Sequence, residues 1–166
     1  SAASDVYKRQ MSTWLEALQI AIPAQEPCVL VTVAGIQGST PREEGARMVY
    51  TATQQFDTIG GGHLEWRAAQ IARDMLANSA PNRRMNHAER IALGPSLGQC
   101  CGGVVFLAFE IIGQRGATML SGLAQCCKEG RNIWRALPLE SDEAAMLYDL
   151  KGIACDANAS DDALTV

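Results

Sequence analysis

Two adjacent cysteines, Cys100 and Cys101, lie in a glycine-rich run that no packing rule requires. The run, residues 93–103, reads Leu-Gly-Pro-Ser-Leu-Gly-Gln-Cys-Cys-Gly-Gly and leads directly into an apolar segment. Glycine is favoured where a backbone takes a positive φ or approaches a ligand closely. We call this run the cysteine loop and regard it as a candidate ligand site, in which Gln99, Gly102 and Gly103 flank the two thiols.

The chemistry open to the two thiols is limited by their neighbours. A free cysteine has a pKa near 8.5, so only about 3% is thiolate at neutral pH. Nucleophilic catalysis needs a base, and neither His63 nor His87 is placed beside the cysteines by local spacing. An adjacent pair is also wrongly spaced to chelate zinc. A soft ligand for a soft metal, or a sulfur-transfer relay, fits better, and simple packing under a tight turn is the alternative.

A second candidate is the segment Gly38-Ser-Thr-Pro-Arg42, here the first glycine loop. A threonine before a proline, with a glutamate three positions after the threonine, is a helix-start signature. One short turn here would present backbone N–H groups and the side chains of Ser39, Thr40 and Arg42 to an anion. A capped connector with a solvated arginine is the alternative.

A third candidate is the second glycine loop, formed by Gly60, Gly61 and Gly62 between a predicted strand and a predicted helix. The amide groups at a helix start bind phosphate. The spacing is neither the G-x-G-x-x-G dinucleotide fingerprint nor a Walker A loop. His63 and Glu65 fall in the first helical turn: His63 is either a ligand contact or a surface histidine, and Glu65 suits the helix dipole in any case.

The composition is that of one globular domain with its own core. The chain has 166 residues, of which 48% are hydrophobic and 19% charged. A net charge of −4 argues against a broad nucleic-acid interface. No apolar run reaches the roughly 18 residues of a membrane span, and the start does not resemble a signal peptide. Four of the six cysteines form adjacent pairs, in which a disulfide is strained. We therefore expect a cytoplasmic protein with reduced thiols.

Hydrophobic patterns predict a single α/β domain with a mixed β-sheet flanked by helices and glycine-rich loops at strand ends. The expected strands are residues 28–34, 46–52, 57–59 and 104–112, and the strongest helical pattern is residues 63–78. Residues 1–10 read as a non-native or disordered leader, a helix before Pro23 follows, and residues 82–90 read as a polar connection. Beyond residue 113 the signal weakens, with a helix at 117–126, a strand at 133–137 and a helix at 141–150.

The three loops, taken with their order and flanking residues, resemble the N-terminal domain of xanthine dehydrogenase accessory proteins, the XdhC/CoxI family. The resemblance covers about residues 11–110 and rests on the first glycine loop with Gly45-Ala-Arg-Met48, on Thr58-Ile-Gly-Gly-Gly-His-Leu-Glu-Trp66, and on the cysteine loop. It implies a chaperone that binds the molybdenum cofactor (molybdopterin). The chaperone would hold the cofactor while a cysteine desulfurase installs its terminal sulfur, and would then deliver it to the molybdenum subunit of apo-xanthine dehydrogenase.

The resemblance also suggests roles for the three loops. The second glycine loop, with Arg42 and Ser39, would suit the cofactor's phosphate, and Cys100 and Cys101 would face the molybdenum or its incoming sulfur. Such a protein carries the cofactor and is not an enzyme, and homodimerisation is compatible with the family.

The chain departs from the family after about Glu110. Members usually continue into a Rossmann-like second domain, which residues 113–166 do not supply, so we expect residues 11–112 to form the cofactor-binding domain and the rest a weakly defined extension. Two other readings remain open at this point: a small thiol-dependent hydrolase or sulfurtransferase using Cys100 or Cys101, and a nonfunctional fragment.

Overall fold

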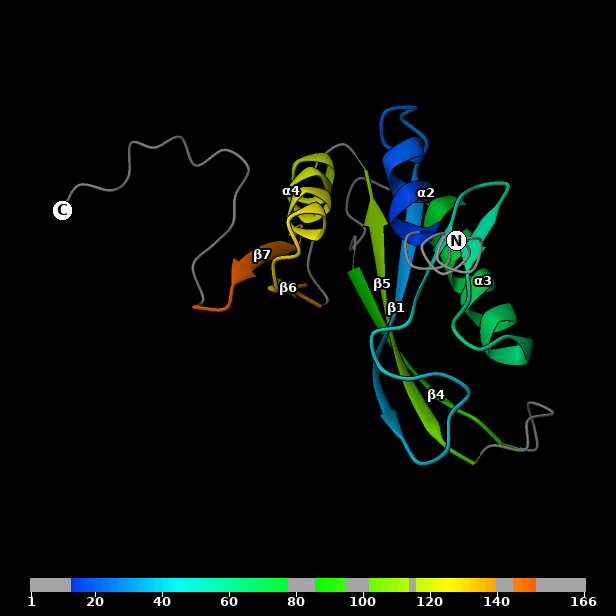
Figure 1. Ribbon diagram of the computed structural model, residues 1–166. Helices are drawn as coiled ribbons and strands as arrows, with labels where there is room; N and C mark the ends of the chain where they lie inside the picture. The colour runs from blue at the N-terminus through cyan, green and yellow to red at the C-terminus, as the bar shows by residue number, and fades with distance from the viewer. Residues whose placement is uncertain (1–12, 78–85, 95–101, 114–115, 140–144, 152–166) are drawn as a thin grey trace, which may run out of the picture.

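A nearly continuous run of apolar and β-branched residues forms the central strand of the protein, β1 (Cys28–Gln37). The computed structural model describes residues 13–77, 86–94, 102–113, 116–139 and 145–151. Within them β1 is the middle strand of a five-stranded sheet with the order β3-β2-β1-β5-β4 (Figure 1). The other strands of this sheet are β2 (Arg47–Tyr50), β3 (Gln55–Asp57), β4 (Asn86–Ala92) and β5 (Val104–Ile112).

The sheet confirms the α/β class but corrects the expected strand directions. Every pairing between the described strands of this sheet is antiparallel, whereas we expected a mixed sheet. The reason is that hairpin loops join β1 to β2, β2 to β3 and β4 to β5, and a hairpin reverses the chain. The long connection through the helix α3 (Gly62–Ala77) runs from one edge strand, β3, to the other, β4.

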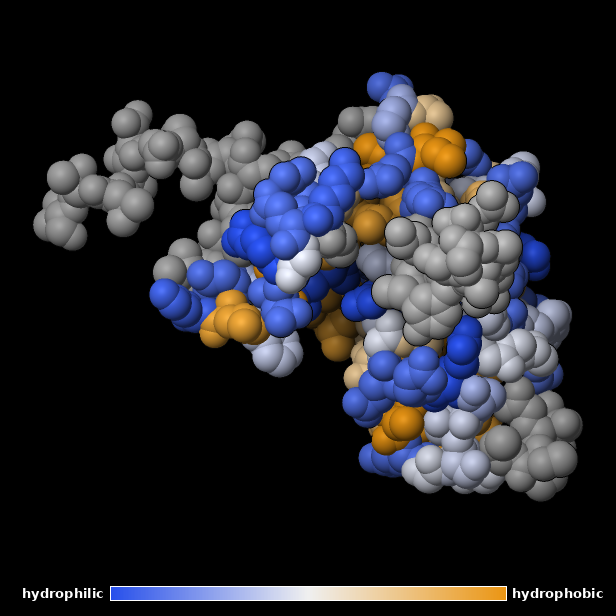
Figure 2. Space-filling view, viewed as in Figure 1, coloured by the Kyte–Doolittle hydropathy of each residue, from blue (hydrophilic) through white to orange (hydrophobic). Residues whose placement is uncertain are grey.

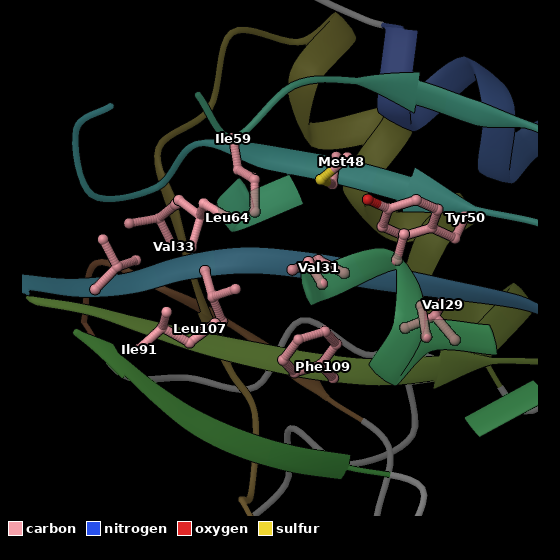
Figure 3. Close-up of a cluster of buried hydrophobic side chains, with 14 of the residues drawn as sticks. Val29, Val31, Val33, Met48, Tyr50, Ile59, Leu64, Ile91, Leu107 and Phe109 are labelled. Carbon is pink, nitrogen blue, oxygen red and sulfur yellow. The ribbon is translucent and has the colours of Figure 1, made fainter. Parts of the chain in front are cut away.

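Both faces of the sheet are covered, as the continuous apolar pattern of β1 predicts. Figure 3 shows the first core, in which side chains of β1 and β5 lie beneath α3. The second core contains Cys28 and Leu30 of β1 together with residues of α2 (Thr13–Ala21) and α4 (Ala117–Lys128). Alternate residues of β1 therefore serve the two cores.

The helix α3 matches its prediction within a residue at each end. Its buried residues recur at helical spacing and form one stripe: Leu64, Ala68, Ala69, Ala72 and Met75. This stripe packs on the same face of the sheet as Val31 and Phe109. Burial of that face fixes where the helix begins, and with it the position of the second glycine loop.

Residues of the segments that follow β5 pack into the second core of the large sheet. The helix α4 leads to a two-stranded antiparallel sheet, β6 (Ile133–Ala136) and β7 (Met146–Asp149). The helix predicted over residues 141–150 is wrong, because residues 146–149 pair as a strand with β6. Arg135 of β6 donates a hydrogen bond to the buried carboxylate of Glu110 on β5, and the Asn86 side-chain amide donates to the Pro138 carbonyl at 2.8 Å. These contacts attach the small sheet to the large one.

Three further expectations need correction. The strand predicted at residues 57–59 lies at 55–57, where it pairs with β2. The segment predicted as a polar connection contains β4, which starts at Asn86. The strand predicted at residues 28–34 continues to Gln37 after a register shift, and there it pairs with β5 alone.

The surface of the protein is mostly hydrophilic on the face that Figure 2 shows, as expected for a globular composition. On the face shown in Figure 2, hydrophobic residues form small separate groups among hydrophilic ones. Among the described helices, none combines the length and apolarity that a membrane crossing requires.

Candidate functional site

Two of the predicted loops leave the sheet at the same register, at the start of β5. Val104 pairs with Gln37 on one side and with Ala92 on the other. The Leu93 N–H donates to the Gly103 carbonyl at 2.8 Å, which closes the base of the cysteine loop as a hairpin connection between β4 and β5. The first glycine loop follows β1 at the same end of the sheet, the lower end in Figure 1.

Gly103 is the point at which these two loops touch. A Cβ atom built at Gly103 would lie 2.2 Å from the Ser39 carbonyl oxygen and 2.8 Å from that of Gln37. A Cβ at Gly38, where φ is +72°, would lie 3.3 Å from the Gly103 Cα. Only glycine allows two backbones to approach this closely. The glycines of both motifs therefore serve a backbone contact between the loops.

The second glycine loop meets the first from the other side. Gly60 has a φ of +124°, and a Cβ there would lie 2.7 Å from the Pro41 ring and 3.4 Å from the Arg42 Cγ. The first glycine loop thus lies between Gly60 and Gly103. These contacts bring described residues of the three stretches to one place.

A single carboxylate organises the second glycine loop. The Oε1 atom of Glu65 accepts hydrogen bonds from the Ile59 N–H at 3.0 Å, from the Gly61 N–H at 2.8 Å and from the Thr58 hydroxyl. Its Oε2 atom accepts one from the Gln55 side chain at 3.0 Å. The carboxylate reaches back from the first turn of α3 in the manner of a capping box. The Gly60 N–H also donates, to the Thr58 hydroxyl at 3.1 Å. The amides of Ile59, Gly60 and Gly61, which we expected to be free for phosphate, are therefore already bonded.

These contacts set the acidity of Glu65. Partial burial raises its pKa, but the hydrogen bonds from Thr58, Gly61, Gln55 and Ile59 favour the charged form and together outweigh burial. The pKa of Glu65 therefore lies below its ordinary value of 4.5. At neutral pH the loop is held by an ionised carboxylate.

We expect the stabilising effect of Glu65 to disappear in acid. A group with a depressed folded-state pKa contributes its full stability above its unfolded value, here 4.5, and loses it as the pH falls through the folded value. Urea unfolding of the wild type and of Glu65→Gln would measure this at about pH 7 and about pH 3. The stability gap between the two proteins should be largest at neutral pH and should close in acid, while the exposed Glu43→Gln control shows little gap. A gap that does not change with pH would contradict the assignment.

The first glycine loop differs from its prediction. Residues 38–39 and 41–42 form bends rather than a helical turn, and the Thr40 hydroxyl donates to the Arg42 carbonyl at 3.0 Å instead of capping a helix. Ser39 is exposed, Arg42 is half-buried, and no ion pair joins Arg42 to any described residue. The serine and the guanidinium are thus the polar groups that this loop offers.

The other predicted residues divide into three groups. Gly62 and Gly102 are exposed, and a Cβ at Gly102 would meet no atom within 4 Å. His63 is half-buried, with its ring 4.8 Å from that of Trp66. Gln99, Cys100 and Cys101 lie outside the described residues, so their predicted roles stay predictions.

Among the described residues, no three histidine, cysteine or acidic side chains gather in a way that could hold a metal ion. Cys28 packs as a small hydrophobe, as expected: burial, assisted by nearby Glu26 and Glu110, raises the pKa of its thiol to about 12. Such a thiol is almost entirely protonated at neutral pH and therefore inert.

The sequence did not reveal Thr58 or Gln55 as part of the site. Their hydrogen bonds to Glu65 span seven and ten positions, which exceeds the three-residue spacing of a capping box. The contact between Pro41 and Gly60 had no sequence signal either, because it joins two different loops.

The fold and these contacts define an α/β domain in which two hairpin loops and a strand-to-helix loop meet at one end of an antiparallel sheet. The model of the XdhC and CoxI family matches residues 21–86, about two fifths of the chain. The family resemblance carried by the motifs is thereby confirmed. The matched residues include both glycine loops, and the cysteine loop lies beyond them.

A solved structure from Bacillus halodurans, described as a xanthine dehydrogenase, has the same fold. The two superpose with a TM-score of 0.68 at 18% sequence identity, over 87% of this chain and 44% of that one. This chain therefore spans less than half the length of that protein. No curated protein matches the chain.

Proposed function

We propose that this chain is a molybdenum-cofactor chaperone for the maturation of xanthine dehydrogenase. It binds the cofactor, holds it while a cysteine desulfurase supplies the terminal sulfur, and delivers it to the molybdenum subunit of the apo-enzyme. The match of the XdhC and CoxI family model to residues 21–86 supports this role. The observation that carries the proposal is the meeting of the first glycine loop with Gly60 on one side and Gly103 on the other.

The described residues fit the cofactor's phosphate in a way that differs from the sequence expectation. The Ile59 and Gly61 amides already bond to Glu65, so they do not suit a second anion. Arg42 is the better candidate, because it is half-buried and has no ion-pair partner among the described residues. A guanidinium is well matched to phosphate geometry. Ser39, exposed on the same loop, would add a hydroxyl donor.

The cysteine loop supplies the remaining chemistry in this proposal. Its base is fixed by the Leu93–Gly103 hydrogen bond and by the contact of Gly103 with the first glycine loop. Cys100 and Cys101 belong to this loop and would face the dithiolene-bound metal, where sulfur ligands suit a soft centre. When bound, the cofactor supplies the metal and sulfur chemistry, and the protein's part is to hold and orient it.

Binding of the cofactor is the test of this function. Purified protein would be mixed anaerobically with molybdopterin cofactor, and bound pterin would be measured by fluorescence after oxidative release. We expect stoichiometric binding, weakened roughly tenfold or more in Arg42→Ala, since a charge-assisted contact contributes about 1.5–3 kcal/mol. The Cys100→Ala/Cys101→Ala double variant should also bind more weakly.

Two variants of the same residue types outside the candidate site serve as matched controls for cofactor binding. Arg131→Ala removes an exposed arginine that pairs with Glu129, and Cys126→Ala removes a buried thiol of the second core. Both should bind like the wild type. A folded wild-type protein that binds no cofactor would refute the proposed function.

A further inference from the structure

We propose that Glu65 is the positioning residue of the candidate site. Its carboxylate, and not a ligand's phosphate, is the anion that the second glycine loop binds. Held in this way, the second glycine loop anchors the Ser39–Arg42 segment. The inference rests on the proposed function only where it calls the anchored segment ligand-binding. The anchoring itself can be measured without any ligand.

The hydrogen bonds of Glu65 account for the loop's capacity to hold an anion. Four donors converge on the carboxylate: two backbone amides, one hydroxyl and one side-chain amide. Gly60 and Gly61 have φ values of +124° and +77°, and the amides of Ile59 and Gly61, two positions apart, both donate to the same Oε1 atom. A glycine loop at a helix start usually offers such amides to a ligand, and here a side chain of the helix itself occupies them.

The anchored loop then controls the neighbouring one through direct contact. Pro41 packs on Gly60 so closely that a Cβ there would lie 2.7 Å from its ring. Arg42 follows immediately, with its Cγ on the same glycine. Because the backbone at Gly60 is fixed by hydrogen bonds on either side, at Ile59 and Gly61, it forms a rigid support for this segment. Loss of the carboxylate frees that support without removing any atom of the first glycine loop.

Other elements also hold Glu65 and its helix in place. The Tyr50 hydroxyl donates to the Glu65 main-chain carbonyl at 3.0 Å, which ties the first turn of α3 to β2. Leu64, on the preceding position, is fully buried in the first core. The carboxylate is thus delivered to the loop from a helix that is packed on the core.

The test is an anion titration followed by amide NMR on the full chain. Uniformly ¹⁵N-labelled wild type, Glu65→Ala and Glu65→Gln would each be titrated with sodium acetate and with inorganic phosphate at constant ionic strength. In the wild type we expect no saturable shift of the Ile59, Gly60 or Gly61 signals with either anion. In Glu65→Ala, acetate should shift the Ile59 and Gly61 signals saturably and return the Gly38 and Ser39 signals toward their wild-type positions.

Two variants keep the result interpretable. Glu65→Gln retains an acceptor oxygen, so its Gly38 and Ser39 signals should stay close to those of the wild type even if Glu65→Ala folds poorly. Glu129→Ala removes an exposed glutamate in the turn after α4 and should respond to neither anion.

Three results would overturn the inference. The first is saturable phosphate binding at Gly60 or Gly61 in the wild type. The second is a Glu65→Ala protein whose first-loop signals are unchanged, and the third is a Glu65→Gln protein whose first-loop signals move as far as those of Glu65→Ala. Failure of the proposed function is a separate outcome, in which the wild type binds no molybdopterin while the loop signals respond to Glu65 as described.

Discussion

Replacing Gly103 by alanine is expected to destabilise the protein by about 3 kcal/mol and to separate the first glycine loop from the cysteine loop. The new Cβ would lie 2.2 Å from the Ser39 carbonyl oxygen, a distance that real Cβ contacts do not reach. Neither side can yield easily, because both groups in the contact are backbone. Gln37 pairs with Val104 in the adjacent position, so the strain would also reach the end of the sheet.

Gly102 provides a matched control one position earlier. A Cβ at Gly102 would meet no atom within 4 Å, so Gly102→Ala should change the free energy of unfolding by less than about 0.5 kcal/mol. Urea unfolding of both variants measures the difference. In the cofactor titration Gly103→Ala should bind weakly. Equal stability of the two variants would show that the loops do not pack as described.

Removal of the buried arginine at position 135 should be about as costly. The Arg135 and Glu110 side chains are 12% and 5% exposed, and their ion pair joins β6 to β5. Removing one partner of a buried pair leaves a charge without compensation, which costs about 3–5 kcal/mol. We therefore expect Arg135→Met to unfold at a markedly lower urea concentration. The double variant Glu110→Leu/Arg135→Met should recover most of the loss, because it removes both charges.

The pH dependence of Arg135→Met provides a second measurement. Burial raises the pKa of Glu110 above its ordinary value of 4.5, although Arg135 and the Ala145 amide N–H act against that rise. Without the arginine the pKa rises further, so the folded state binds more protons than the unfolded state above pH 4.5. Stability then falls as the pH increases.

The gap between wild type and Arg135→Met should consequently widen from about pH 5 to about pH 8. Arg131→Met, which disrupts the exposed pair with Glu129, is the control and should cost less than about 1 kcal/mol at any pH. A gap of the same size at both pH values would mean that Glu110 is not the buried charge left behind.

Local sequence patterns were enough to predict the two elements with a continuous or regularly spaced set of buried residues. The strand β1 was predicted from its apolar run and the helix α3 from its helical spacing, because burial against the core sets the residue pattern of each element. The edge strand β4 was largely missed, because His87 and Glu89 alternate with exposed residues and provide no apolar stripe. The strand β7 was mistaken for a helix, because its four residues acquire their conformation by pairing with β6.

The sequence likewise predicted some features of the candidate site and not others. Glycines in three motifs indicated that backbone would approach something closely, and at Gly60 and Gly103 it does. The sequence suggested a ligand as the other party, whereas at these two positions it is another loop of the same chain. The partners of Glu65 were equally hidden, since they come from the strand and loop before its helix and are brought together by the fold.

The central position of β1 has a consequence for synthesis on the ribosome. Its partner on one side, β2, follows within a few residues, but Cys28 meets Ile112 of β5 only 84 positions later. At 5–20 residues per second, β1 waits roughly 4 to 17 s with one edge unpaired. The strand is apolar and rich in β-branched residues, and an unpaired strand of this kind can pair with other chains. The nascent protein therefore has a defined interval, between the emergence of β1 and that of β5, in which chaperone protection matters most.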